Sequence, residues 1–156
     1  MMSMYFEEVT KDTLYIALEM INSNPEYNVF ENGKETREIT DLEEEFLNQT
    51  TISAFIKLDD TYIGIIDYLL ENPNDHFPWL GLLMIHGDYQ GYGFGAQAYA
   101  LYEKEMQKRG FDRVRIGVLK ENKKAQQFWE SLGFVYFKTT SSKNGSRIFC
   151  YEKFIG

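Results

Sequence analysis

The chain has 156 residues, of which 44% are hydrophobic and 26% are charged, and its formal net charge is −8. That length is typical of one domain, here residues 1–156, and the apolar content excludes a disordered chain. The negative charge disfavours nucleic acid as a partner, because phosphate binding needs a basic surface, and it slightly favours a cationic or amine-bearing substrate.

The first third of the chain predicts one strand and two helices. Residues 5–9 have the composition of a strand, and the apolar residues of the segment 13–21 recur at helical spacing. The segment NSNPEYN is expected to end this first helix. Thr40 and Glu43 then have the spacing of a capping box, which predicts a second helix over residues 41–48.

The next two segments predict a β-hairpin. Residues 51–58 and 61–70 are rich in β-branched and aromatic side chains, and Asp59 and Asp60 between them suit a tight turn. The segment ENPNDHFP is a loop. The run WLGLLMI, residues 79–85, predicts a buried strand.

Helices and strands alternate in the second half of the chain. Residues 95–110 predict a helix, and Asn122 and Gly133 have the residue types expected at the two ends of the next one. The remaining strands are predicted at residues 113–119, 134–140 and 147–154, the last two joined by a turn with Asn144-Gly145. The order βααβββαβαββ indicates an α/β (α+β) fold with a mixed sheet.

The stretch QGYGFGA, residues 90–96, lies between a predicted strand and a predicted helix. Such a glycine-rich turn binds anions, since the first helix amides lack intrahelical partners and carry the positive end of the helix dipole. The alternative is a tight turn that serves chain geometry alone. No Gly-Lys-Ser/Thr follows, which excludes a P-loop. The G-x-G-x-G spacing disfavours a dinucleotide site and hence a nucleotide-binding oxidoreductase.

Two segments of the chain resemble one known family. Gln90-Gly91-Tyr92-Gly93-Phe94-Gly95 is similar to the Q/R-x-x-G-x-G/A motif of the GNAT superfamily of N-acetyltransferases. A second family pattern, N-x-x-A-x-x-[aromatic or Leu]-Y-x-x-x-G-F, is matched by Asn122, Ala125, Phe128-Trp129 and Gly133-Phe134, with Trp129 in place of the tyrosine. The resemblance implies a GNAT-like acyl-CoA N-acyltransferase fold, a twisted mixed sheet of about 6–7 strands flanked by about four helices.

The resemblance also implies acetyl-CoA as cosubstrate, with no metal. The loop amides would hold its pyrophosphate, and the preceding strand would offer backbone groups to the pantetheine arm and the acetyl carbonyl. The implied cofactor-binding residues are Leu83, Met84, Ile85, Gln90, Gly91, Tyr92, Gly93, Phe94, Gly95, Ala96, Asn122, Ala125 and Phe128. Asn122 is equally a helix cap, and Ala125 and Phe128 are equally core residues.

The proton-transfer groups depart from the family pattern. Trp129 stands where many relatives have a tyrosine placed to protonate the CoA thiolate, and an indole N–H does not give up its proton. The strand WLGLLMI holds no acid that could serve as general base. The candidate bases are His86, just past that strand, and Asp67, near the end of its own, with Tyr68 and Tyr92 as weaker ones. Each is equally explained as an ordinary polar residue at a strand end.

These residues predict an acetyl-CoA-dependent N-acetyltransferase, whose acceptor amine, in a small molecule or a peptide, attacks the thioester directly in a ternary complex. The alternative is an acyl-CoA-binding sensor or partner module with weak turnover. A single cysteine, Cys150, excludes an internal disulfide and suits the cytoplasm. We expect no signal peptide, no membrane span and no multi-histidine metal site. The aromatic content fits a homodimer interface or a well-filled core.

Overall fold

The computed structural model describes residues 2–156, which form seven β-strands and five α-helices. In chain order they are β1 (Met4–Glu8), α1 (Leu14–Asn22), α2 (Pro25–Asn32), α3 (Ile39–Phe46), β2 (Ile52–Leu58), β3 (Thr61–Leu69), β4 (Trp79–Ile85), α4 (Phe94–Lys108), β5 (Arg113–Leu119), α5 (Lys123–Ser131), β6 (Val135–Ser141) and β7 (Arg147–Phe154). Short 3₁₀ turns, η1 (Lys11–Thr13) and η2 (Gly87–Tyr89), precede α1 and follow β4.

The strands form one sheet in the order β1-β2-β3-β4-β5-β7-β6. Neighbouring strands are antiparallel except β4 and β5, which are parallel. The predicted mixed sheet of six or seven strands with flanking helices is therefore confirmed.

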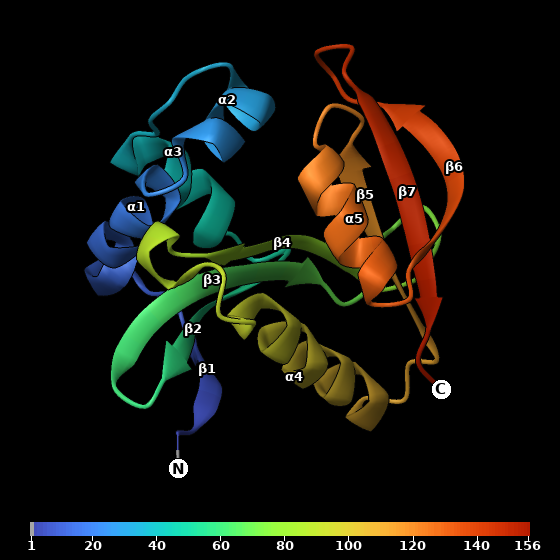
Figure 1. The fold of residues 1–156 in the computed structure, drawn as a ribbon, viewed down its shortest axis with the longest axis horizontal. Helices are drawn as coiled ribbons and strands as arrows, with labels where there is room; N and C mark the ends of the chain where they lie inside the picture. Colours follow the sequence, from blue (N-terminus) through green and yellow to red (C-terminus); the bar gives the residue numbers. More distant parts are fainter. Residues whose placement is uncertain (1) are drawn as a thin grey trace.

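Helices cover both faces of the sheet, with α1–α3 gathered on one side of β2–β4 and α4 on the other (Figure 1). The core beneath α1 and α3 consists of Val9, Leu14, Ala17, Met20, Ile21, Leu42, Phe46, Phe55, Ile65, Leu82 and Met84. In the second core, α4 and α5 contribute Ala98, Tyr99, Tyr102, Met106 and Trp129. Because β4 supplies Leu82 and Met84 to one core and Leu80 and Ile85 to the other, this strand is held from both faces.

The structure has one helix more than the sequence predicts. The segment NSNPEYN does end α1, but its Pro25 is also the first residue of α2. Proline suits this position, because the first helical N–H has no intrahelical partner and the fixed φ of proline is already helical. Gly33, with φ +76°, ends α2. The sequence analysis interpreted the proline only as the end of a helix. Its prediction that no helix begins here was wrong for that reason.

The capping box of α3 lies two residues earlier than predicted. The backbone N–H of Glu38 donates to Asp41 Oδ2 at 3.0 Å, so the helix begins at Ile39 rather than after Thr40. The predicted and the observed capping boxes have the same residue spacing, so the spacing alone does not distinguish them. The earlier start is favoured because it places Ile39 against the core beneath α1 and α3.

The parallel strands β4 and β5 separate after a short contact. Their registered pairs are Trp79 with Arg115 and Leu80 with Ile116. The next residue of β4, Gly81, has no partner on β3. The register of the β3–β4 pairing shifts at this point, between Asp67 and Tyr68. An extra residue of this kind bends the strand that contains it. The bulge at Gly81 thus marks the point where β4 leaves β5.

We predict that Gly64→Ala lowers the free energy of unfolding by about 1–3 kcal/mol, the usual cost of overpacking. A Cβ on Gly64 would lie 2.5 Å from the carbonyl oxygen of Met84, a backbone atom that cannot move without opening the β3–β4 ladder. Urea unfolding measures the change.

Gly81→Ala is the matched control on the neighbouring strand, since its Cβ would meet only Asp67 O at 3.5 Å, an ordinary contact. An equal loss of stability in both variants would contradict this packing argument.

Candidate active site

A cavity of about 850 Å³ opens where β4 and β5 part. Its walls are the segments Leu80–Ile85 of β4 and Ile116–Leu119 of β5, with the glycine loop and α5 around its rim. We call this cavity the cleft. Its volume lies within the range of small-molecule and cofactor sites.

The glycine loop closes one end of the cleft with backbone rather than side chains. Gly91 and Gly93 have φ values of +87° and +83°, a region that other residues rarely adopt. Gly93 is the N-cap of α4, so the amides of Phe94, Gly95 and Ala96 are the first of that helix and have no intrahelical partner. All of these residues line the cleft. The amides and the positive end of the helix dipole together favour a bound anion.

Side chains tie this loop to the connection between α1 and α2. The Ile85 carbonyl accepts hydrogen bonds from Gln90 Nε2 at 2.8 Å and from Asn24 Nδ2 at 3.2 Å. Gln90 Nε2 also donates to Asn24 Oδ1, and Gly87 N donates to Ser23 Oγ at 3.0 Å. The loop therefore cannot shift without moving the helices on the neighbouring face.

The backbone of β4 presents free donors to the cleft. His86 N donates to Ile63 O on β3 at 2.8 Å. Backbone groups alternate along an antiparallel strand, so Met84 N–H also faces β3, whereas those of Leu83 and Ile85 face the cleft. The Ile85 carbonyl agrees with this alternation, because its partners are side chains rather than β3.

Helix α5 forms the far wall. Asn122 Oδ1 accepts from Ala125 N at 3.1 Å, which caps the helix, and Asn122 also lines the cleft. The rings of Phe128 and Trp129 meet edge to face, with centroids 5.0 Å apart, and both border the cleft. Trp129 also packs against Tyr99 of α4, so its indole is fixed by aromatic contacts on two sides.

The structure gathers most of the residues named from the sequence around the cleft. Those that line it are Leu83, Met84, Ile85, Gln90, Gly91, Gly93, Phe94, Gly95, Ala96, Asn122, Ala125 and Phe128. Tyr92 does not, and 69% of its surface is exposed. Lys124, in the first turn of α5, also borders the cleft.

Neither candidate base borders the cleft. His86 is buried, its Nδ1 accepts from Asp88 N at 3.0 Å, and its Nε2 lies 2.9 Å from Glu19 Oε1. Because Nδ1 is an acceptor, Nε2 carries the proton, and the Glu19 carboxylate accepts it. Both ring nitrogens of His86 are thus engaged in holding α1 and η2 to the end of β4.

Asp67 is buried on the face of β3 that α1 and α3 cover. Ser53 Oγ donates to its Oδ1 at 2.8 Å. Burial raises the pKa of Asp67, although hydrogen bonds from Thr51 and Ser53 act in the opposite direction. The carboxylate is therefore enclosed by its own neighbours, away from the cleft.

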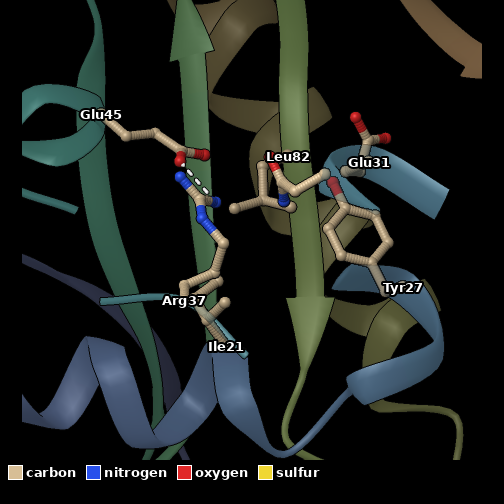
Figure 2. A pocket seen from close by; sticks show the side chains of 7 residues that line it. Ile21, Tyr27, Glu31, Arg37, Glu45 and Leu82 are labelled. Carbon is tan, nitrogen blue, oxygen red and sulfur yellow. Dashed lines mark ion pairs between the residues drawn. The ribbon is translucent and has the colours of Figure 1, made fainter. Parts of the chain in front are cut away.

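A smaller pocket of about 90 Å³ lies between β4 and the helices α1–α3. We call it the side pocket. Figure 2 shows Tyr27 and Glu31 of α2 on one side of Leu82, and the ion pair of Arg37 with Glu45 on the other. Arg37 Nη1 lies 3.0 Å from Glu45 Oε2. Tyr27, Glu31 and Leu82 line both this pocket and the cleft.

Sequence reasoning did not single out these pocket residues. Tyr27 and Glu31 lie on the helix that the prediction missed, and Arg37 follows it in the connection to α3. The available signal was indirect: Glu31 stands one turn after Tyr27, a spacing that puts both on one face once a helix is assumed.

Metal-binding clusters and membrane-spanning helices are both absent from residues 2–156. No three His, Cys, Asp or Glu side chains in that range gather closely enough to hold a metal ion. No helix there is long and apolar enough to cross a membrane.

The chain was compared with known proteins by family model, by sequence and by fold. The model of the acetyltransferase (GNAT) family matches residues 17–134. A search of curated proteins gave no significant match.

Solved structures of acetyltransferases share the fold. One from Thermus thermophilus has a TM-score of 0.82 at 22% identity, over 97% of both chains. Spermidine N-acetyltransferase from Vibrio cholerae, solved with CoA and spermine, has a TM-score of 0.74 at 15% identity, over 97% of this chain and 95% of that one. A Salmonella typhimurium acetyltransferase that modifies the N-terminal serine of ribosomal protein L7/L12 has a TM-score of 0.80 at 9% identity, over 99% and 96%.

We predict that Asp67→Asn raises the melting temperature at about pH 7.5 and that this gain shrinks toward about pH 4. The pKa of Asp67 is higher in the folded state than in the unfolded chain. The folded state therefore binds this proton more tightly and loses that stabilisation as pH rises through the folded-state pKa. Asparagine avoids the cost of burying a negative charge, and its side-chain oxygen can still accept a hydrogen bond from Ser53.

Asp60→Asn, in the exposed turn between β2 and β3, serves as control. A gain for Asp67→Asn that is constant with pH, or larger in acid, would contradict the assignment of a buried carboxylate with a raised pKa.

Proposed function

Because the chain belongs to the acetyltransferase (GNAT) family, we propose that it transfers an acetyl group from acetyl-CoA to a primary amine by direct attack in a ternary complex. The observation that carries this proposal is the separation of β4 from β5 directly above an N-terminal helix end with left-handed glycines. The separated strands would leave a slot for the extended pantetheine arm, and the helix amides at one end of that slot would bind the pyrophosphate.

The residues of the cleft fit acetyl-CoA in kind and position. The amides of Gly93 to Ala96 would bind the pyrophosphate, and Lys124 would add a positive charge beside it. The N–H groups of Leu83 and Ile85 would hold the pantetheine amides and the thioester carbonyl. Acetyl-CoA, when bound, supplies a thioester whose carbonyl carbon accepts the amine nitrogen.

The fixed donors of β4 would act on the developing negative charge of the carbonyl oxygen. A backbone N–H that is already oriented costs no reorganisation during the reaction, and such a donor contributes on the order of 3 kcal/mol of transition-state stabilisation. Only the N–H of Leu83 and that of Ile85 face the cleft from the strand segment 83–85. This strand thus both positions the acyl group and stabilises its charge.

The departing thiolate would take its proton without help from Trp129. Its indole N–H is a donor only, and edge-to-face contacts with Tyr99 and Phe128 fix the ring. A thiolate is a stable enough leaving group to be protonated by water or by the attacking amine itself. We therefore assign Trp129 to shaping the cleft.

The acceptor would approach from the α1–α3 side of β4, where the side pocket meets the cleft. The net charge of −8 favours a cationic amine, in a small molecule or a peptide. The fold-related enzymes act on both kinds, spermidine in one and a ribosomal protein in another. The single cysteine, buried on β7, suits a reaction in the cytoplasm.

We predict micromolar binding of acetyl-CoA by isothermal titration calorimetry, and a loss of at least about 100-fold in Gly93→Asp and Gly95→Asp. Each substitution places a carboxylate among the amides that would hold the pyrophosphate, and the like charges repel one another.

Gly110→Asp is the matched control for Gly93→Asp. Both glycines have a positive φ, +90° and +83°, and open space at the Cβ position, but Gly110 lies at the other end of α4. Absence of binding by the wild-type protein would refute the proposal. Binding without turnover of any amine in a panel would instead support the acyl-CoA-binding module.

We predict that Trp129→Phe lowers kcat by less than about tenfold, whereas loss of a true general acid costs on the order of 10²–10⁴. Phenylalanine keeps an aromatic ring against Tyr99 and Phe128 but lacks the N–H. Steady-state kinetics at saturating acetyl-CoA give the answer. A drop of 100-fold or more, with acetyl-CoA affinity intact, would show that the indole takes part in proton transfer.

A further inference from the structure

The side pocket and the cleft meet at one carboxylate. Of the charged residues of the side pocket, Glu31 alone also lines the cleft. It lies on α2 across from Leu82 of β4, next to the strand segment whose N–H groups face the cleft (Figure 2). Glu31 is exposed at the mouth of the pocket, so both a substrate and bulk water reach it.

The cation that lines the side pocket forms its ion pairs with carboxylates other than Glu31. Arg37 is committed to Glu45 at 3.0 Å and, more loosely, to Asp41 at 3.8 Å. Within residues 2–156, Glu31 has no ion-pair partner. The three charged residues that line the pocket, Glu31, Arg37 and Glu45, therefore leave one net negative charge at its entrance.

The far wall of the pocket is held in place by amide side chains. Asn22 Nδ2 donates to the carbonyl of Arg37 at 3.1 Å, and Asn22 Oδ1 accepts from the Arg37 N–H at 2.8 Å. Asn28 Nδ2 donates to the Glu35 carbonyl at 2.9 Å. These contacts pin the connection after α2 to the helices, so the Arg37–Glu45 pair is preorganised as a fixed wall opposite Glu31.

The surroundings of Glu31 tune it as a proton acceptor. Desolvation by the protein atoms around it and the charge of Glu45 raise its pKa, while Arg37 and a hydrogen bond with Tyr27 act in the opposite direction. Burial, and secondarily the negative charge of Glu31, raises the pKa of Tyr27, which therefore stays protonated. A carboxylate whose pKa moves toward the working pH is a better general base.

We propose that Glu31 binds the ammonium group of an unbranched primary alkylamine at the junction of the two cavities and takes its proton. This inference rests on the acetyl transfer proposed above and adds the base and the acceptor class. A volume of about 90 Å³ corresponds to roughly three water molecules, which accommodates an ammonium and a short alkyl segment but not a bulky group.

Protons and electron pairs balance in this reaction. The acceptor ammonium gives one proton to the Glu31 carboxylate, and the neutral amine nitrogen forms a bond to the thioester carbonyl carbon. The carbon–sulfur bond breaks, its electron pair leaves with the sulfur, and the second nitrogen proton passes to the thiolate. Glu31 then releases its proton to water at the open mouth of the pocket.

The test compares two amines of similar size in the wild-type protein and in Glu31→Gln. The probe n-propylamine is charged at neutral pH, whereas 2,2,2-trifluoroethylamine is mostly neutral there. We expect Glu31→Gln to lower kcat/KM at least about 100-fold for n-propylamine and less than tenfold for trifluoroethylamine. The loss for n-propylamine should shrink as pH rises, because more of the amine is then already neutral.

Glu35→Gln is the control, since Glu35 is exposed and lines neither cavity. Acetyl-CoA titration of each variant separates the two proposals: unchanged affinity with the expected amine-dependent loss supports the role of Glu31. Three outcomes would overturn it. The first is an equal loss of kcat/KM for the two amines in Glu31→Gln, and the second is a loss no greater than in Glu35→Gln. The third is a wild-type protein that binds acetyl-CoA but does not acetylate n-propylamine. Failure of the wild type to bind acetyl-CoA would refute the underlying function instead.

Discussion

The whole arrangement depends on the short contact between β4 and β5. Two parallel pairs join the halves of the sheet, and the bulge at Gly81 then turns β4 away. Backbone groups that would otherwise pair with β5 are left facing a cavity, which is costly unless something else binds them. The sheet tolerates this because Leu82 and Met84 pack against one core while Leu80 and Ile85 pack against the other.

The two sides of β4 are coupled at its last residue. The Ile85 carbonyl binds both Gln90 of the glycine loop and Asn24 of the α1–α2 connection. A cosubstrate that orders the glycine loop would therefore also order the helices that border the side pocket. His86, next in the chain, reinforces the link through Glu19 of α1. The polar residues at this strand end thus connect the expected cofactor and acceptor sides.

Charge divides the site into two regions with different chemistry. At the cleft end, unpaired helix amides and Lys124 present positive potential to an anion. At the side pocket, Arg37 is neutralised by Glu45, and Glu31 leaves a negative charge beside Leu82. An anionic cosubstrate would thus be drawn to the glycine loop that follows β4, and a cationic acceptor to the middle of the same strand. The reacting atoms would meet between them, where fixed N–H groups of β4 are available.

The sequence alone was enough to predict the strands, four of the five helices and the glycine loop, because apolar periodicity and clustered glycines are local signals. It missed α2 because a proline that ends one helix can also begin the next, and only packing decides between the two. The resemblance of two segments to one family, rather than any local signal, named the expected cofactor-binding residues, most of which line the cleft. The surroundings of His86, Asp67 and Glu31 depend on the tertiary structure, since the groups that act on them, Glu19, Ser53 and Glu45, come from other elements of the chain. Burial and neighbouring charge set the pKa of such groups, and neither can be read from sequence spacing.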